Sequence, residues 1–314
     1  MQAVLGIDIG GTSIKAGLFS PEGELLEERK IPTPALVNAE AFAIVTDGLT
    51  HLLAAHDNTP EDVIACGLDI PGPVADDGKV GFLPNIQLDP DGLVAAINAA
   101  FPNAAIAFVN DANAAALGEL WAGVAHGVSS FVLIALGTGV GAGVVVNGRL
   151  VAGAFGAGGE IGHMCLNPDE ERTCGCGGHG HLEQYSSATG VVSNYLAECK
   201  KAGVEPIELT GPSDSKDVFQ ACREGDKLAL AAADTMADYL GRALALIANV
   251  VDPEMFLIGG GASASADVYL DAVREHFQHY ALSASRETPI EVASLGNDAG
   301  IIGAAYVALR AAGK

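Results

Sequence analysis

Apolar runs broken by glycine and proline dominate this sequence, and their lengths predict alternating strands and helices. Residues 3–9 and 63–70 are short and almost entirely apolar, which is typical of strands buried on both faces of a sheet. Residues 39–55 and 226–251 read as helices, and the second run ends before Asp252-Pro253. Further strands are expected at residues 14–19, 25–31, 105–109, 131–136, 142–146 and 255–258, and further helices at 91–100, 111–121 and from about 299. The alternation predicts an α/β fold.

One strand–turn–strand plan occurs twice in the chain. Residues 4–12 and 132–139 each contain an apolar strand that ends in a glycine turn. Such an internal duplication predicts two related domains that face a cleft. We expect a first domain at residues 1–118, rejoined by a C-terminal helix at about 299–314, and a second domain at residues 119–298. A loop rich in glycine, histidine and cysteine fills residues 153–181 of the second domain.

Composition narrows the class of protein. A chain of 314 residues can form two hydrophobic cores, and only 18% of its residues are charged. The formal net charge of −23 disfavours binding to nucleic acid or to anionic membranes, and every long apolar run is broken by glycine. The first residues lack the basic region of a signal peptide. Six cysteines do not suggest a disulfide scaffold in a chain of this length, so we expect a cytoplasmic protein with reduced thiols.

Three glycine turns follow apolar strands, and they predict a phosphate site. The turns are Gly10-Gly11-Thr12, Gly137-Thr138-Gly139 and Gly259-Gly260-Gly261. A tight glycine turn exposes successive backbone N–H groups, which bind phosphate oxygens without cationic side chains. We expect glycine here because a positive φ and a close approach to phosphate both exclude a Cβ atom. Asp8 and Lys15 flank the first turn, and an acid at the end of a buried strand is costly unless it serves a metal ion or a hydrogen-bond network.

Two other nucleotide-binding patterns are disfavoured. Residues 137–142 fit the dinucleotide fingerprint G-x-G-x-x-A, but that fingerprint must open a helix. Here an apolar strand and the hairpin turn Asn147-Gly148 follow instead. The Walker A pattern is absent from the sequence, so a P-loop kinase is also disfavoured.

Four segments resemble the motifs of ROK-family sugar kinases. Residues 8–15 (DIGGTSIK) are similar to the family's D-I-G-G-T-x-x-K opening, and residues 109–114 (VNDANA) to its catalytic N-D-A-N-A. Residues 159–163 (GEIGH) resemble its sugar-binding G-E-x-G-H, and residues 174–183 (CGCGGHGHLE) its zinc-and-sugar motif C-x-C-G-x-x-G-C-x-E. The resemblance spans essentially the whole chain in the right order. It implies a two-domain ribonuclease-H-like (actin-like ATPase) fold with an active-site cleft between the domains.

The resemblance also implies an ATP-dependent kinase with Asp111 as its base. Asp111 stands between a strand end and a helix start, where helix N–H groups favour a carboxylate, and it would accept the proton of the sugar 6-hydroxyl. Implied sugar-binding residues are Asn110, Asp111, Glu160, His163 and Glu183, with Gly72 and Asn85 helping to close the cleft. Implied nucleotide-binding residues are Asp8, Gly10, Gly11, Thr12, Lys15, Gly137, Thr138, Gly139, Gly260 and Gly261. Mg²⁺ is expected to arrive with ATP, and Asp8 is expected to assist it through water.

A structural zinc site is implied by the last motif. The family usually has a third cysteine where this chain has His181. Imidazole is itself a good zinc ligand, so the expected set is His163, Cys174, Cys176 and His181. His179 lies close by in the sequence and leaves the ligand identity open. Zinc would fix the loop that carries the sugar site rather than take part in the chemistry.

The expected substrate is a hexose, with glucose first. N-acetylglucosamine, N-acetylmannosamine and fructose remain alternatives, because they present the same kind of polar groups and the sequence does not show the room near the 2-position. The family also contains sugar-responsive repressors with an added N-terminal DNA-binding segment. Here the first strand begins at residue 3 and the charge is wrong for DNA. A non-catalytic sugar-sensing protein is disfavoured by Asp111 and the glycine turns, and the resemblance suggests a homodimer.

Overall fold

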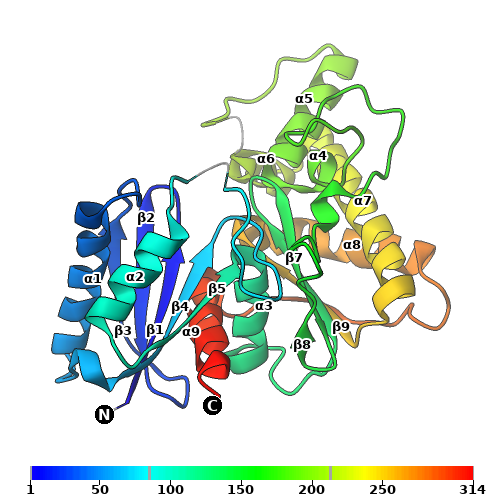
Figure 1. Cartoon of the computed structure of the whole chain (residues 1–314). Coiled ribbons are helices and arrows are strands. Elements are labelled where there is room, and N and C mark those ends of the chain that lie inside the picture. Colours follow the sequence, from blue (N-terminus) through cyan, green and yellow to red (C-terminus); the bar gives the residue numbers. More distant parts are fainter. Residues whose placement is uncertain (1, 84–85, 212–213, 314) are drawn as a thin grey trace. The chain divides into compact units, whose positions relative to one another are not determined.

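The computed structural model describes residues 2–83, 86–211 and 214–313, and the chain divides into two compact units. Unit 1 consists of Met1–Val128, Leu150–Gly158 and Ser294–Lys314, and unit 2 of Ser129–Arg149 and Gly159–Ala293. Each unit contains a five-stranded sheet with helices packed on it (Figure 1). A boundary after residue 118 would cut helix α3 (Asp111–Ala122). The domain limits expected from the sequence stay a prediction, since compactness alone does not show that either unit folds independently.

The sheet of unit 1 has the strand order β3-β2-β1-β4-β5. Its strands are β1 (Ala3–Ile9), β2 (Ser13–Phe19), β3 (Leu25–Pro32), β4 (Val63–Ile70) and β5 (Ala105–Asn110). β1 pairs antiparallel with β2 and parallel with β4, and β4 pairs parallel with β5. The five strands expected from the apolar runs are confirmed to within one residue at either end.

Helices cover both faces of this first sheet (Figure 1). They are α1 (Ala39–Ala54), α2 (Pro90–Ala100), α3 and α9 (Ala299–Ala311), with short 3₁₀ turns at Pro60–Asp62 and Gly296–Asp298. Leu5 and Ile7 of β1 pack in one cluster with Leu49 of α1 and Leu93 of α2. Val4 packs on the other face with residues of α9. The expected C-terminal helix is therefore confirmed, and it packs on the N-terminal sheet.

Two glycines let α9 lie unusually close to the sheet. A Cβ atom on Gly6 would lie 2.0 Å from the carbonyl oxygen of Ile301, and one on Gly67 would lie 1.8 Å from that of Ala304. Side chains alternate along a strand, so the next residues on this face are Asp8 in β1 and Asp69 in β4. These two aspartates are register partners. The packing that brings α9 close thus also places its first turn beside two carboxyl groups.

The second sheet repeats the plan of the first. Its order is β10-β9-β6-β7-β8, with β6 (Phe131–Leu136), β7 (Val140–Val146), β8 (Arg149–Leu150), β9 (Met255–Gly259) and β10 (Ile290–Val292). β6 pairs antiparallel with β7 and parallel with β9, and β9 pairs parallel with β10. The duplication expected from the glycine hairpins is confirmed at the level of topology. Strand β10 was not expected, because three residues are too short to give an apolar pattern.

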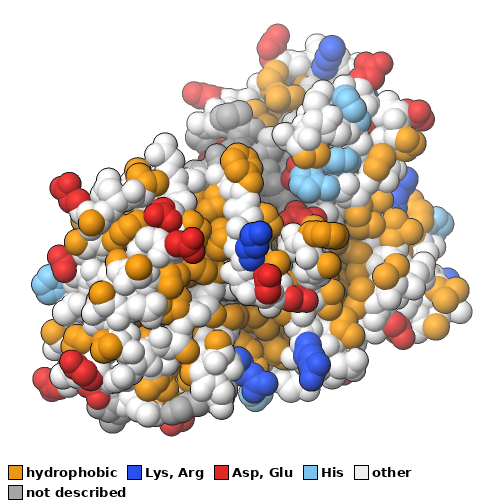
Figure 2. Space-filling view, viewed as in Figure 1, with side chains coloured by type: hydrophobic (Ala, Val, Ile, Leu, Met, Phe, Trp, Pro, Cys, Tyr) orange, Lys and Arg blue, Asp and Glu red, His pale blue; other side chains and the backbone are white. Residues whose placement is uncertain are grey.

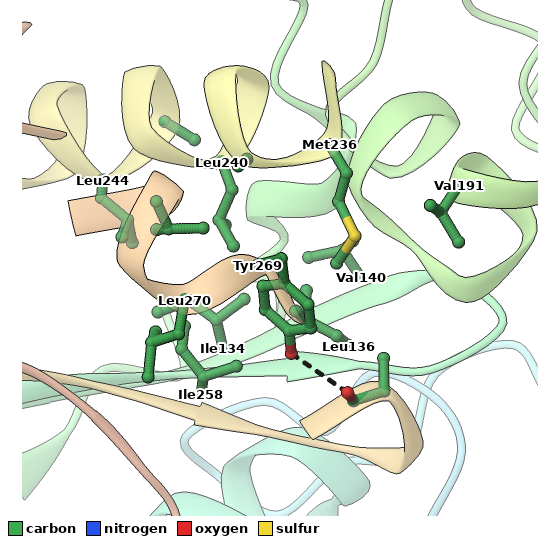
Figure 3. Packing of buried hydrophobic residues seen from close by; sticks show 14 of the residues in the cluster. Ile134, Leu136, Val140, Val191, Met236, Leu240, Leu244, Ile258, Tyr269 and Leu270 are labelled. Carbon is green, nitrogen blue, oxygen red and sulfur yellow. Dashed lines mark hydrogen bonds between the residues drawn. The ribbon is translucent and has the colours of Figure 1, made fainter. Parts of the chain in front are cut away.

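The helices of unit 2 enclose its core. They are α4 (Glu183–Ser186), α5 (Ala188–Ala202), α6 (Ser215–Arg223), α7 (Lys227–Val251) and α8 (Ala266–Tyr280), with 3₁₀ turns at Ile161–His163 and Gly261–Ser265. Figure 3 shows Met236 and Leu240 of α7 among strand residues such as Ile134, and Tyr269 of α8 donating a hydrogen bond to the carbonyl oxygen of Ala262 at 3.1 Å. Helix α7 begins after Asp226, whose side chain accepts from two N–H groups, and ends at Asp252 in a left-handed conformation.

Lysine and arginine side chains are sparse on the face of the molecule drawn in Figure 2, in keeping with the negative net charge. Within the described parts of the chain, no helix has the length and apolar character needed to cross a membrane.

Candidate active site

Three aspartates of unit 1 lie at the carboxyl ends of neighbouring parallel strands. Asp8 is near the end of β1, Asp69 is near the end of β4, and Asp111 opens α3 directly after β5. Ligands of open α/β sheets bind at this edge. A Cβ atom on Gly300 would lie 2.5 Å from Asp69 Oδ2 and 3.5 Å from Asp8 Oδ2, so both carboxyl groups reach the first turn of α9. Sequence reasoning missed Asp69, although an acid inside the apolar run 63–70 was a usable signal.

Asp111 is positioned by the N-terminus of α3. The N-cap residue Asn110 accepts hydrogen bonds from the N–H groups of Ala112 and Asn113 at 3.1 and 3.2 Å. The Ala112 N–H also donates to Asp111 Oδ1 at 2.8 Å. Asn110 Nδ2 donates to the carbonyl oxygen of Gly72 at 3.1 Å. The structure therefore brings Gly72, Asn110 and Asp111 together, whereas Asn85 lies outside the described residues.

The three carboxyl groups perturb one another. Burial raises the pKa of Asp111, and hydrogen bonds from Ala112 and Asn110 work against that rise. Burial also raises the pKa of Asp8, the charge of Asp111 adds to it, and Lys15 partly offsets it. The Asp111 side chain is nevertheless open to solvent, which is the property that decides whether a ligand can reach it. Repulsion within the cluster therefore disfavours charge on all three groups at once.

Asp69 is the most deeply buried of the three. Only 2% of the residue is exposed, and its Oδ1 atom has no hydrogen-bond partner among the described residues. Burial raises the pKa of Asp69 well above its ordinary value, and the charges of Asp8 and Asp111 add to the rise. A carboxyl group in this environment favours its neutral form.

The first two glycine turns differ from expectation in their backbone. Gly10, Gly11, Gly137 and Gly139 are not in the positive-φ region, so the expected need for positive φ is wrong at these turns. The Gly10 N–H donates to the carbonyl oxygen of Ser13 at 3.2 Å, and that of Gly137 to the carbonyl oxygen of Gly139 at 3.0 Å. These bonds close both turns with ordinary backbone angles.

The third turn does need its central glycine. Gly260 has φ +79°, and a Cβ atom there would lie 2.6 Å from the backbone nitrogen and oxygen of Leu136. Gly260 therefore lets this turn pack directly against β6, and the expected positive φ is confirmed here. Gly261, which begins the following 3₁₀ turn, meets no atom within 4 Å of an added Cβ.

Lys15 is paired with carboxylates. Its Nζ atom lies 2.9 Å from Glu28 Oε2 and also forms an ion pair with Asp298. Burial lowers the pKa of Lys15, but the hydrogen bonds to Asp298 and Glu28 outweigh it and leave the pKa raised. In this structure the side chain links β2 to β3 and to the residue before α9.

The cysteine–histidine loop of unit 2 forms a four-residue cluster. One ligand atom each of His163, Cys174, Cys176 and His181 lies within 4.8 Å of the others. The two thiol sulfurs are 3.4 Å apart, and Cys176 Sγ lies 3.3 Å from His181 Nδ1. Figure 2 shows a group of histidine side chains on the drawn face. Two thiols and two imidazoles are a donor set that suits Zn²⁺ in a closed tetrahedral site.

His179 has a different partner. Its Nδ1 atom lies 3.0 Å from the carbonyl oxygen of Arg172, which also accepts a hydrogen bond from Gln184 Nε2 at 2.8 Å. The side chain of His179 is outside the four-residue cluster. The geometry therefore favours His181 over His179 as the fourth ligand.

The implied sugar-binding residues of unit 2 surround His163. Its Nε2 atom is 3.9 Å from Glu160 Oε2, and its Nδ1 atom is 3.8 Å from Glu183 Oε1. The thiol of Cys174 donates to Glu183 Oε1 at 2.8 Å. Burial, followed by the nearby Glu183 carboxylate, raises the pKa of the Cys174 thiol to about 12. Glu183 thus lies against the four-residue cluster.

Glu183 also touches the second glycine turn. A Cβ atom on Gly139 would lie 2.7 Å from Glu183 Oε2, so a side chain there would displace the Glu183 carboxylate. A cavity of about 460 Å³ adjoins this contact, and its lining includes Thr138, Gly139, Glu183 and the start of α5. The structure therefore joins the second glycine turn, the cysteine–histidine loop and this cavity within unit 2.

Comparison with known proteins shows the family. A sequence model of the ROK family matches residues 4–311, and the chain belongs to this family. The glucokinase of Halalkalibacterium halodurans is 36% identical to it over 324 aligned residues, which cover 96% of this chain and 94% of the relative. The N-acetyl-D-glucosamine kinase of Escherichia coli O127:H6 is 30% identical, with 97% and 98% covered.

A solved structure shows the same architecture. The crystal structure of a ROK family glucokinase from Streptomyces griseus, in complex with glucose and AMPPNP, matches with a TM-score of 0.78 and 31% identity. The match covers 98% of this chain and 99% of the other. The predicted family and fold class, the two-domain actin-like ATPase fold, are confirmed by these similarities.

Proposed function

We propose that the chain is an ATP-dependent hexose kinase that transfers the γ-phosphoryl group of ATP to a hydroxyl group of glucose. The observation that carries the proposal is the placement of Asp111, a solvent-accessible carboxylate with a raised pKa at the carboxyl end of the sheet. Phosphoryl transfer needs a base beside the attacking hydroxyl group and positive charge at the phosphates. Similarity to a glucokinase over nearly the full length of both chains supports the reaction and the choice of sugar.

Asp111 acts as the general base. It accepts the proton of the sugar 6-hydroxyl while that oxygen attacks the γ-phosphorus. A raised pKa makes the carboxylate a better proton acceptor. Asn110, which caps the same helix, and Gly72, whose carbonyl oxygen accepts from Asn110, hold this edge of the sugar site in place.

The nucleotide is held by backbone N–H groups rather than by a basic side chain. The turns at Gly10–Thr12 and Gly137–Gly139 present these groups to the phosphates, and the turn that contains Gly260 and Gly261 completes the nucleotide site. Asp8 would assist a metal ion bound with ATP through water. Mg²⁺, bound with ATP, supplies the positive charge that the acidic cluster and the phosphates require. Lys15, paired with Glu28 and Asp298, contributes by fixing the strand after the first turn.

The cysteine–histidine loop holds the other edge of the sugar. Glu160, His163 and Glu183 bind the remaining hydroxyl groups, and their mutual contacts support this role. Zn²⁺, bound by His163, Cys174, Cys176 and His181, supplies a fixed geometry for the loop. The family resemblance further suggests a homodimer, which light scattering tests.

The main alternative within the class is an N-acetylhexosamine kinase, since one relative carries that activity in its name. A 2-hydroxyl group can donate to the carboxylates of Glu160 and Glu183, whereas an acetamido group needs more room. A site built to pair a hydroxyl group discriminates strongly against an analogue that lacks it. We therefore place glucose ahead of N-acetylglucosamine, N-acetylmannosamine and fructose.

A coupled assay of ADP release with a panel of these four hexoses tests the proposal. We expect the highest kcat/KM with glucose. A higher value with an N-acetylhexosamine would overturn glucose as the substrate and leave the kinase reaction standing. No sugar-dependent ADP release with any hexose would overturn the kinase reaction itself.

A further inference from the structure

Glu119 is a buried carboxylate that the reaction described above does not use. It lies in the last turns of α3 and is 0% exposed. Its Oε1 atom accepts hydrogen bonds from the N–H groups of Ser294 and Leu295, both at 2.7 Å. Its Oε2 atom accepts from the Val124 N–H and from the Ser294 hydroxyl group, both at 2.9 Å. All four donors are aimed at one carboxylate, which offsets the cost of removing its charge from water.

These donors lie where the chain enters and leaves unit 1. The chain passes from one unit to the other after Val128, Arg149, Gly158 and Ala293. Val124 lies shortly before the first of these points, and Ser294 and Leu295 directly follow the last. Two of the four segments that connect the units therefore have their unit 1 ends hydrogen-bonded to the side chain of Glu119.

Glu119 also shares its helix with the proposed base. Asp111 is the first residue of α3, and Glu119 follows two turns later. The helix is packed tightly against α9: a Cβ atom on Gly118 would lie 2.5 Å from the Ala299 carbonyl oxygen, and one on Gly303 would lie 1.7 Å from that of Ala114. Helix α3, helix α9 and residues 294–295 thus form one closely packed block, in which the carboxylate of Glu119 is the polar link.

Gly123 leaves room for this carboxylate. A Cβ atom on Gly123 would lie 2.0 Å from Glu119 Oε2. The backbone of Gly123 does not have a positive φ, so a side chain there is opposed by the contact and not by the backbone conformation. Glycine at position 123 therefore leaves the room that the Glu119 side chain occupies.

We propose that Glu119 is a positioning residue for phosphoryl transfer, which fixes the helix that presents Asp111 to the ends of two connections to unit 2. The inference rests on the proposed function, because it takes Asp111 as the base. A carboxylate required only for folding would affect stability alone. A positioning residue also affects turnover, because a small misplacement of the base slows the reaction without weakening substrate binding.

The test compares Glu119→Gln with the wild type in the ADP-release assay. The assay temperature is well below the thermal unfolding midpoint of both proteins. The amide keeps the size of the side chain, but its nitrogen cannot accept, so the hydrogen bonds at one atom are lost. We expect kcat to fall about tenfold or more, with the KM values for glucose and ATP changed by less than about twofold. Glu40→Gln, at an exposed glutamate of α1, is the matched control and should leave kcat unchanged.

Two further variants and one physical measurement make the result specific. Gly123→Ala leaves Glu119 in the sequence, but its methyl group would lie 2.0 Å from Glu119 Oε2 and 2.8 Å from Glu119 Cα. It should therefore displace the carboxylate together with the end of the helix and reproduce the fall in kcat. Ser294→Ala removes one of the four hydrogen bonds and should lower kcat about two- to fivefold. Amide hydrogen exchange should become faster in Glu119→Gln on the side that meets the new NH₂ group, which is either Ser294 and Leu295 together or Val124.

The outcomes separate the inference from the proposed function. An active wild type whose Glu119→Gln variant has a lower unfolding midpoint but an unchanged kcat would overturn the positioning role. If Glu119→Gln does not fold, Ser294→Ala decides the question by the same criterion. A wild type that is inactive on every hexose would overturn the proposed function, and the inference with it.

Discussion

At the scale of single residues, two buried carboxyl groups of unit 1 differ in their hydrogen-bond partners. Glu119 is satisfied by four donors, whereas Asp69 has an oxygen without a partner among the described residues and lies beside two further acids. A buried carboxylate that accepts several hydrogen bonds can stabilise a fold. A carboxyl group beside other negative charges has a raised pKa and favours its protonated form or a bound cation. The crowded group lies at the ligand-binding edge of the sheet, and the satisfied group lies at the far end of the same helix as Asp111.

The unfavourable environment of Asp69 predicts that Asp69→Asn stabilises the protein at neutral pH. Because folding raises the pKa of this carboxyl group, the folded state binds its proton more tightly than the unfolded state does. The free energy of unfolding of the wild type should therefore fall as the pH rises from the ordinary pKa through the raised one. An amide does not ionise, so the variant should be more stable at pH 7 by on the order of 1 kcal/mol.

Denaturant unfolding of both proteins between pH 4 and pH 8 measures this effect. The difference in the free energy of unfolding should grow with pH in favour of the variant. A difference that stays constant across this range would show that Asp69 does not titrate differently on folding.

The four-residue cluster predicts one zinc ion per chain, held by His181 and not by His179. His181→Ala should lose the metal after gel filtration, because it removes one of four ligands. His179→Ala should keep it, since that side chain is hydrogen-bonded to Arg172 instead. The KM for glucose should rise in the first variant while that for ATP stays close to the wild-type value. Elemental analysis of the purified proteins decides: the reverse pattern would exchange the two histidines, and a wild type without zinc would mark a lost site.

At the scale of secondary structure, the sequence predicted most elements but not the pairings that build the site. Apolar runs between glycine and proline are strong local signals, so β1, β4 and α7 were located to within a residue. The contact between Asp8 and Asp69 depends on the register of two strands more than fifty residues apart, which no local pattern encodes. Glu119 follows Gly118 in a helical segment, where an acid is typical of a solvated face. Its burial arises only when residues 294–295 pack against the helix.

The glycine turns were located correctly, and one reason offered for their glycines was wrong. Their ordinary φ values remove the conformational argument at Gly10 and Gly137. At Gly10 an added Cβ atom would lie 3.0 Å from the carbonyl oxygen of Ser13, so the fold itself leaves little room for a side chain. At Gly137 the nearest atom is 4.0 Å away, so close approach to phosphate stays the predicted reason for glycine there. Gly139 is an intermediate case, because its missing side chain makes room for Glu183.

The substitution Gly137→Ala tests phosphate binding at the second turn. The nearest atom to an added Cβ is the carbonyl oxygen of Gly139 at 4.0 Å, so the fold should accept the methyl group. We expect the KM for ATP to rise about tenfold and the KM for glucose to change little, because the methyl group keeps phosphate away from the backbone N–H groups. Steady-state kinetics with each substrate varied in turn give both values. An unchanged KM for ATP would remove this turn from the nucleotide site.

At the scale of the whole molecule, one topology is used twice with different chemistry. The orders β3-β2-β1-β4-β5 and β8-β7-β6-β9-β10 correspond strand by strand, and each has a glycine turn between its two central antiparallel strands. Unit 1 adds the aspartates at the strand ends, and unit 2 adds the cysteine–histidine loop with Glu160 and Glu183. In the proposed function, unit 1 supplies the base with its neighbours Asn110 and Gly72, and unit 2 supplies Glu160, His163 and Glu183 for the other sugar hydroxyl groups.

The substitution Asp111→Asn tests whether Asp111 is the general base of phosphoryl transfer. Asparagine can keep the position at the start of α3, but it cannot accept the proton of the sugar hydroxyl group. The measurement is kcat for glucose phosphorylation in the coupled ADP-release assay, with glucose binding to the same protein checked by calorimetry. If Asp111 is the base, the variant should bind glucose with an affinity close to that of the wild type and lose about a hundredfold or more in kcat. A folded variant with a kcat near that of the wild type would contradict the assignment of Asp111 as the base.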